Sequence, residues 1–362
     1  MKERIRNYFR DLSGLHGVSG SEQAVVRYMK EKLEPLVDEL IVDTSGNVIA
    51  IKHGTSPGPK LMIAAHSDEI GFCVKNILDN GFILYDKIGS ASDKVMEGRK
   101  VWIKENIPGV IGIKPGHLQT PEESRKVKTT KECYIDAGCS SRSEVEALGI
   151  KIGDPIAYHS DFMEMANTDL ICTKAVDDRI NCAILIELFD QLKDADVAGT
   201  IVGAITVQEE IGMRGAVMVG NAVDPDYAIV IDTIPAGDTP DVNTLRDLPV
   251  YLGKGPACAV ASGIMYGILF SIAHPKVKQA IEDAAEKTGV NIQYTSLVGD
   301  GYATDAERLN ISGTGIPLAT LAVPRRYSHS PVELFNINDA VDSLKVLKNI
   351  IHANGDIDLS FI

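Results

Sequence analysis

Two adjacent carboxylates, Glu209 and Glu210, follow an apolar run at residues 200–207 that predicts a buried β-strand. Neighbouring side chains on an extended chain point in different directions, so one carboxylate can bind a metal ion while the other faces the substrate as a base. Four more residues of ligand type occupy similar positions: His66 after residues 60–65, Asp177 before a predicted helix, Asp232 after residues 227–231, and His329 shortly after residues 317–323. Together these residues predict a hydrolytic site with two metal ions.

The positions of these residues matter more than their types. A lone histidine, or an acidic residue at the start of a helix, more often has a structural role than a functional one. In open α/β sheets, however, ligands bind just beyond the carboxyl ends of the strands, and several of these residues fall at such ends. The number of coincidences therefore favours one shared site.

The predicted ligand set suits two divalent ions per subunit. Imidazole nitrogen and carboxylate oxygen are ligands of zinc and cobalt, and manganese also accepts them. A carboxylate between two ions that lie about 3.5–4 Å apart is the natural bridge. We therefore expect His66, Asp177 and Asp232 to hold one ion and Asp177, Glu210 and His329 to hold the other. Each ion then keeps an open position.

Two carboxylates outside this ligand set are predicted to be catalytic. Glu209 is the expected general base, which takes a proton from the attacking water and delivers it to the leaving amine. Asp68, two residues beyond His66, is expected to fix the tautomer of that imidazole. Arg325 and Arg326 either attract an acidic substrate side chain or balance the carboxylates, and we favour charge balance.

The elements that must position these residues follow from apolar periodicity. Helices are predicted at residues 5–12, after a capping-box pair formed by Ser19 and Glu22, and at 179–192, 274–289 and 336–352. Strands are predicted at residues 40–42, 48–51, 61–65, 200–207, 227–232, 291–295 and 317–323. The simplest account is an α/β domain, residues 1–70 plus 166–362, that is interrupted by an insertion.

The insertion, residues 71–165, has a different character. Short apolar runs are separated there by Gly and Pro, a pattern that predicts a small β-rich barrel, with one helix at residues 141–148.

Composition narrows the choice of partners and location. The chain has 362 residues, 44% of them apolar, and a formal net charge of −14, which argues against nucleic acid or an anionic membrane as a partner. No signal peptide is visible at the charged start. The uncharged residues 255–273 contain Pro and Gly and predict a buried core segment. Six scattered cysteines without a CxxC pair indicate reduced thiols, so we expect a cytoplasmic protein.

Motifs along the whole chain resemble one family of peptidases. They occupy residues 14–20, 65–71, 175–179, 207–215, 231–232, 236–240, 253–256, 304–306 and 326–331. In order and combination these blocks resemble the tetrahedral-type (TET) glutamyl or deblocking aminopeptidases, which are dinuclear metallopeptidases.

This resemblance implies several further features. The fold would be a mixed-sheet, zinc-exopeptidase-like α/β domain with an inserted β-rich, PDZ-like barrel used for dimerisation. A non-proline cis peptide bond would follow Asp177, and the ligands and the base would be those assigned above. Peptides would be the substrates, and the chain would assemble into a homododecamer built from dimers.

The leading hypothesis is therefore metal-dependent hydrolysis of N-terminal residues from short peptides. One alternative is a metallohydrolase of another amide, such as an acylated amino acid or a blocked peptide. A second is a glycosidase that uses Glu209 as its acid, although the histidines would then have no purpose. A third is a non-catalytic assembly protein that binds through the insertion, which the complete ligand set disfavours.

Overall fold

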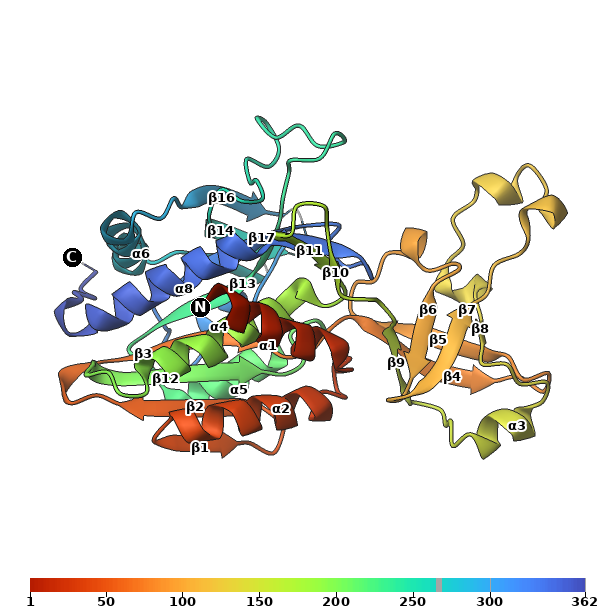
Figure 1. The fold of residues 1–362 in the computed structure, drawn as a ribbon, viewed down its shortest axis with the longest axis horizontal. Coiled ribbons are helices and arrows are strands. Elements are labelled where there is room, and N and C mark those ends of the chain that lie inside the picture. The colour runs from red at the N-terminus through yellow and green to blue at the C-terminus, as the bar shows by residue number, and fades with distance from the viewer. Residues whose placement is uncertain (265–268, 300, 362) are drawn as a thin grey trace.

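The computed structural model describes residues 1–264, 269–299 and 301–361, and these residues form two parts (Figure 1). The larger part is a mixed β-sheet with helices on both faces, and the smaller part is a closed β-barrel that projects from one end of it. The predicted α/β class with a β-rich insertion is confirmed. Among the described residues, no helix is long and apolar enough to cross a membrane.

The sheet of the larger part has twelve strands within the described residues. They are β1 (Glu39–Val42), β2 (Val48–His53), β3 (Ser56–His66), β10 (Met163–Glu164), β11 (Leu170–Thr173), β12 (Ala198–Thr206), β13 (Tyr227–Pro235), β14 (Ala257–Ile264), β15 (Leu269–Ile272), β16 (Gln293–Val298), β17 (Leu318–Arg326) and β18 (Glu333–Asn336). The central strands β12, β3, β13 and β17 are neighbours and run parallel. Their carboxyl ends therefore meet at one edge of the sheet.

Helices cover both faces of this sheet. One face packs against α1 (Lys2–Gly14), α2 (Gln23–Leu33), α4 (Val176–Leu192), α6 (Pro275–Thr288) and α8 (Ile337–His352), and the other against α5 (Arg214–Val223) and α7 (Ala306–Leu309). Along β3, Leu61 and Ile63 join the first core, whereas Met62 and Ala64 join the second. This explains the continuous apolar run of β3, because the strand is buried on both faces.

The barrel is closed by six strands. They are β4 (Gly71–Ile77), β5 (Ile83–Ile88), β6 (Lys100–Ile103), β7 (Ile107–Ile111), β8 (Ile135–Asp136) and β9 (Pro155–Tyr158), and α3 (Arg142–Ala147) lies beside them. Its core holds Phe72 edge-on against Tyr85 and Tyr158, with ring centroids 5.0 and 5.1 Å apart. The chain then returns to the large sheet, where Met163 of β10 pairs with Cys172 of β11.

The structure differs from the predicted capping box, and it describes only part of the predicted core segment at residues 255–273. The expected capping box does not form, because α2 begins at Gln23 and the Ser19 hydroxyl donates instead to Asp68. The Glu22 carboxylate accepts from the amides of Gly20 and Gln208. The predicted core segment 255–273 includes the largely buried strand β14 and the partly buried strand β15, in which Ile272 is exposed, and its residues 265–268 lie outside the described residues.

Candidate metal centre

Parallel pairing brings the predicted ligands to one edge of the sheet. His66 is the last residue of β3 and lies opposite Thr206, the last residue of β12. Asp232 does not follow its strand as predicted, because β13 continues to Pro235. The pairing of β13 with β3 ends at Val230, opposite Ala64, so Asp232 and His66 each lie two residues beyond the last pair and at the same level of the sheet.

Glu209 and Glu210 lie in a turn after β12, and not on an extended chain as predicted. The turn begins at Gln208, whose φ of 59° is left-handed, and the Gly212 amide closes it by donating to the Glu209 carbonyl at 2.9 Å. Asp68 fixes the backbone of both glutamates, since its two carboxylate oxygens accept from the amides of Glu209 (2.9 Å) and Glu210 (3.1 Å). This turn, together with Asp68, sets the different directions of the two glutamates.

Asp68 also lies beside the histidine that it was predicted to orient. Its Oδ1 is 3.4 Å from His66 Nδ1, and its Oδ2 accepts from the Ser19 hydroxyl at 2.6 Å. The carboxylate is fully buried. One side chain therefore links the first strand-end histidine to the glutamate turn.

Asp177 contacts both predicted histidines. A cis peptide bond follows it, as the resemblance implied, and neither Asp177 nor Asp178 has helical backbone angles. Asp177 Oδ1 lies 3.0 Å from His66 Nε2, and Oδ2 lies 3.4 Å from His329 Nε2. The two oxygens of one carboxylate thus face two different halves of the site.

The described residues contain two groups whose ligand atoms all lie within 4.8 Å of one another: His66, Asp178 and Asp232, and Asp177, Glu210 and His329. The structure therefore brings all five predicted ligands together and adds Asp178, which the prediction missed. The adjacent acidic pair 177–178 was the signal for it. The Asp178 carboxylate already accepts from the backbone amide of His66 at 3.2 Å and from the Asn181 side chain.

The electrostatics of the cluster fit divalent cations. Burial and then neighbouring charges, including carboxylates, raise the pKa values of Glu209 and Asp232 well above their usual range, and burial raises that of Glu210 to about 7. Glu210 Oε1 is buried without a hydrogen-bond partner among the described residues. Crowded, buried carboxylates with a free oxygen are costly unless positive charge compensates them.

Arg325 supplies part of that positive charge. Its guanidinium is 3% exposed and donates to Asp177 and to Glu333, the latter at 2.6 Å. Burial opposes ionisation of Asp177, but Arg325 and the two histidines hold its pKa well below the usual range. Arg326 makes two 2.8 Å hydrogen bonds to Asp238. Both arginines thus have carboxylate partners, which supports the charge-balance interpretation.

Left-handed backbone conformations also gather around this cluster. Of the non-glycine residues with positive φ, Ala175, Gln208, Met213, Tyr327 and His329 all lie on the segments that carry the candidate ligands and base. Such conformations cost energy and tend to persist where a site requires them.

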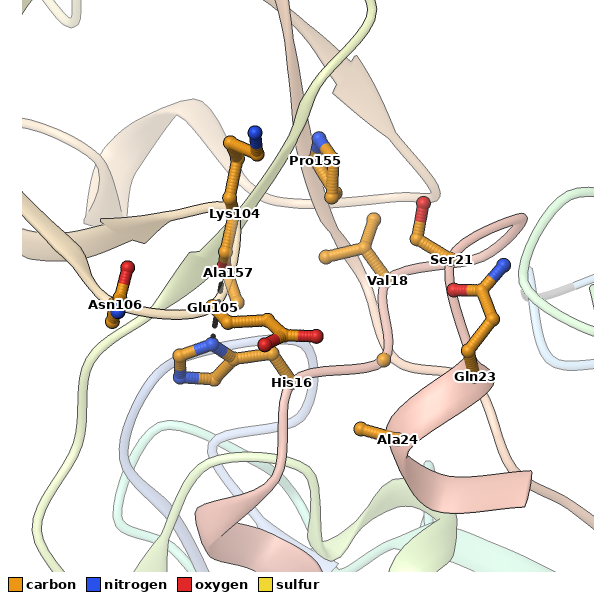
Figure 2. A pocket seen from close by; sticks show the side chains of 11 residues that line it. His16, Val18, Ser21, Gln23, Ala24, Lys104, Glu105, Asn106, Pro155 and Ala157 are labelled. Carbon is orange, nitrogen blue, oxygen red and sulfur yellow. Dashed lines mark hydrogen bonds between the residues drawn. The ribbon is translucent and has the colours of Figure 1, made fainter. Parts of the chain in front are cut away.

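A cavity of about 420 Å³ opens onto the cluster. Beyond the candidate residues, Tyr302, Arg308, Met213 and Leu269 contribute to its walls. A second cavity of equal volume lies between the start of α2 and the barrel, beside His16 and Lys104 (Figure 2). There, His16 Nδ1 lies 3.2 Å from the Lys104 carbonyl oxygen, and burial lowers the pKa of His16. In the described part of the chain, ligand groups for metal occur only at the first cavity.

We expect Asp68→Asn to lower kcat/KM by about 10- to 100-fold, because an amide cannot accept at all the positions that the carboxylate now fills. Ser19→Ala serves as a milder comparison, because it removes only one hydrogen-bond donor to Asp68 and should lower kcat/KM less. Steady-state kinetics with matched metal content would test this. Equal activity of Asp68→Asn and wild type would contradict the positioning role.

The stability of the metal-free protein should fall as pH rises from about 5 to 9. Burial raises the pKa of Glu210 in the folded state to about 7. The contribution of Glu210 to stability is therefore fully present below the ordinary pKa of a glutamate and is lost as the pH rises to about 7. The neighbouring Glu210 carboxylate raises the pKa of His329 to about 9, so the contribution of His329 to stability is lost as the pH rises through 9. The free energy of unfolding that is lost through Glu210 is on the order of 3 kcal/mol.

Thermal unfolding in chelator at several pH values would measure this effect. Saturating zinc should flatten the pH dependence, and Glu210→Gln should flatten the part below pH 7. A pH-independent Tm in chelator would contradict the assignment.

A mixed α/β sheet with an inserted barrel, and a buried cluster of histidines and carboxylates at the carboxyl ends of its strands, define the class of metallopeptidase hydrolases. Residues 46–346 match the model of the M42 glutamyl aminopeptidase family, and the chain belongs to this family.

Similar proteins include a lysyl aminopeptidase and two aminopeptidases or TET proteins of known structure. The lysyl aminopeptidase of Pyrococcus furiosus is 32% identical over 92% of this chain and 93% of that protein. The solved aminopeptidase APDkam598 from Desulfurococcus kamchatkensis is 32% identical, with a TM-score of 0.90 over 97% of this chain and 95% of that chain. The structure of PhTET1-12s, a dodecamer, is 28% identical with a TM-score of 0.82, over 97% and 98% of the two chains.

Proposed function

We propose that this protein is a dinuclear metal-dependent aminopeptidase that hydrolyses N-terminal residues from short peptides. The observation that carries the proposal is the position of Asp177, whose two oxygens face His66 and His329. Asp177, Glu210 and His329, which form one of the two observed groups, would hold one divalent ion. His66 and Asp232 would hold the other together with Asp177, whose Oδ1 lies 3.0 Å from His66, although the observed group with His66 and Asp232 contains Asp178. Zinc, cobalt and manganese all suit this set of nitrogen and oxygen ligands.

When bound, two divalent ions supply Lewis-acid charge for the substrate carbonyl and for the attacking water. Glu209 then acts as the general base: its carboxylate accepts the proton from water and returns it to the leaving amine. The raised pKa of Glu209, which comes from burial and from nearby carboxylates, suits a group that must hold a proton during the reaction. Asp68 positions Glu209 through its amide and orients the His66 ring.

Matched peptides with free and acetylated N-termini would test this proposal. Cleavage should require the free terminus, stop after chelation, and return when zinc, cobalt or manganese is added. Cleavage confined to blocked ends would favour the other metal-dependent amide hydrolase. Glycosidase activity that a chelator leaves unchanged would favour the two-carboxylate mechanism.

We also propose that the chain self-associates, as a homododecamer built from dimers that meet through the barrel. A dodecamer occurs in the similar PhTET1-12s structure. Light scattering after size exclusion should give the mass of twelve chains. A monomer at micromolar concentration would contradict this assembly.

A further inference from the structure

Arg325 occupies an unusual place within the candidate metal centre. It lies near the end of β17, between Pro235 of β13 and Phe335 of β18. Its Nε donates to the Thr233 hydroxyl at 2.5 Å, and one terminal nitrogen donates to Glu333 at 2.6 Å and to Ser328. The other terminal nitrogen donates to Asp177 Oδ2. The guanidinium is therefore fixed on several sides.

The two oxygens of Asp177 are consequently not equivalent. Oδ2, which accepts from Arg325, is also the oxygen that faces His329 at 3.4 Å. His329 Nε2 lies 3.6 Å from Glu210 Oε1, so all three contacts belong to the second candidate group. Oδ1 faces His66 at 3.0 Å. The fixed positive charge thus contacts the proposed bridge on the His329 side, and its attraction to Glu210 of the second group exceeds its attraction to Asp232 of the first.

We propose that Arg325 makes the two ion sites unequal, so that the first ion binds at His66 and Asp232 and the second binds weakly at Glu210 and His329. This inference rests on the proposed two-metal function. A guanidinium remains charged at any relevant pH, and a hydrogen bond from it to Oδ2 withdraws electron density from that oxygen. It also repels a divalent cation a few ångströms away in a buried site, where screening is weak.

Arg326 offers a matched comparison. It is the next residue in the chain and has the same charge, but its partner is Asp238, outside the candidate metal groups. A competing account is that Glu333 cancels the charge of Arg325, in which case the two sites would bind ions equally well. Metal binding distinguishes these accounts without any measurement of turnover.

The first experiment is calorimetric titration of zinc into the metal-free wild-type protein, together with a crystal grown with one equivalent of zinc. We expect two ions whose dissociation constants differ by about tenfold or more, and anomalous density at His66 and Asp232 alone. Equal affinities, or density shared between the two groups, would overturn the inference.

The second experiment asks whether Arg325 is the cause. Arg325→Met should tighten the weaker site by about tenfold, whereas Arg326→Met should leave both affinities unchanged. Because Arg325→Met leaves Glu333 buried without its cationic partner, Arg325→Met/Glu333→Gln provides a second variant in case the single one does not fold. An unchanged weak site in the folded variant would overturn the inference.

These results separate this inference from the proposed function. Unequal binding of two ions without peptide cleavage would count against the function alone. Peptide cleavage with two equal ions would count against the role of Arg325 alone. Binding of a single ion at saturating zinc would contradict both.

Discussion

Replacing Glu209 with Gln should lower kcat by about 10²- to 10⁴-fold, the usual contribution of a general acid–base group. The amide is nearly the same size as the carboxylate but cannot accept the proton. Glu209 is buried and lies outside both candidate ligand groups, so two ions should still bind. Its backbone amide would keep its hydrogen bond to Asp68, which preserves the turn.

Steady-state kinetics and metal analysis on the same sample would test this prediction. Glu39→Gln is a suitable control, because Glu39 is an exposed glutamate whose partner, His53, is also exposed. A Glu209→Gln variant with near wild-type kcat would show that another group is the base. Loss of metal from this variant would instead indicate that Glu209 is a ligand.

Replacing His66 with Ala should abolish binding of the first ion, with affinity falling by more than about 100-fold, beyond the effect of losing an outer-shell partner. His66 is buried, and its ring lies among Asp68, Asp177 and Asp178. Its loss removes a nitrogen ligand and leaves these buried carboxylates without their neighbour. Activity should fall to background even at high zinc.

Metal content after dialysis, measured by mass spectrometry, would test this second prediction. His352→Ala is the control, because His352 is exposed at the end of α8, on a helix that carries none of the candidate ligands. Retention of two ions by His66→Ala would exclude His66 as a ligand. A Tm that falls in His66→Ala but is unchanged in chelator-treated wild type would point to a purely structural role.

Much of the fold followed from local patterns in the sequence. The buried runs of β3, β12 and β13 were recognisable because strands covered on both faces are continuously apolar. The change to short runs broken by Gly and Pro marked the barrel. Helix α8 followed from its amphipathic periodicity. Helix α4 was also predicted as amphipathic, but it is buried on nearly all sides, and the ends of several elements shifted by a few residues.

The candidate site was predicted as a set of residue types at strand ends, and the structure brings those side chains together. The roles assigned to Glu209, Asp68 and the ligands remain predictions. Local sequence patterns could not predict the directions in which these side chains point. Glu209 and Glu210 point apart because of a left-handed turn held by Asp68. Asp178 enters the cluster because the backbone departs from helical geometry there.

The sequence by itself determined the chemistry that is available: which side chains can bind cations, which can carry protons, and which segments are apolar enough to be buried. Only the tertiary structure decided which atoms meet. The Ser19 hydroxyl contacts Asp68, and Arg325 contacts one oxygen of Asp177. These partners lie 49 and 148 residues apart, and no local spacing encodes such contacts, because they arise from the parallel register of strands and from the loops between them.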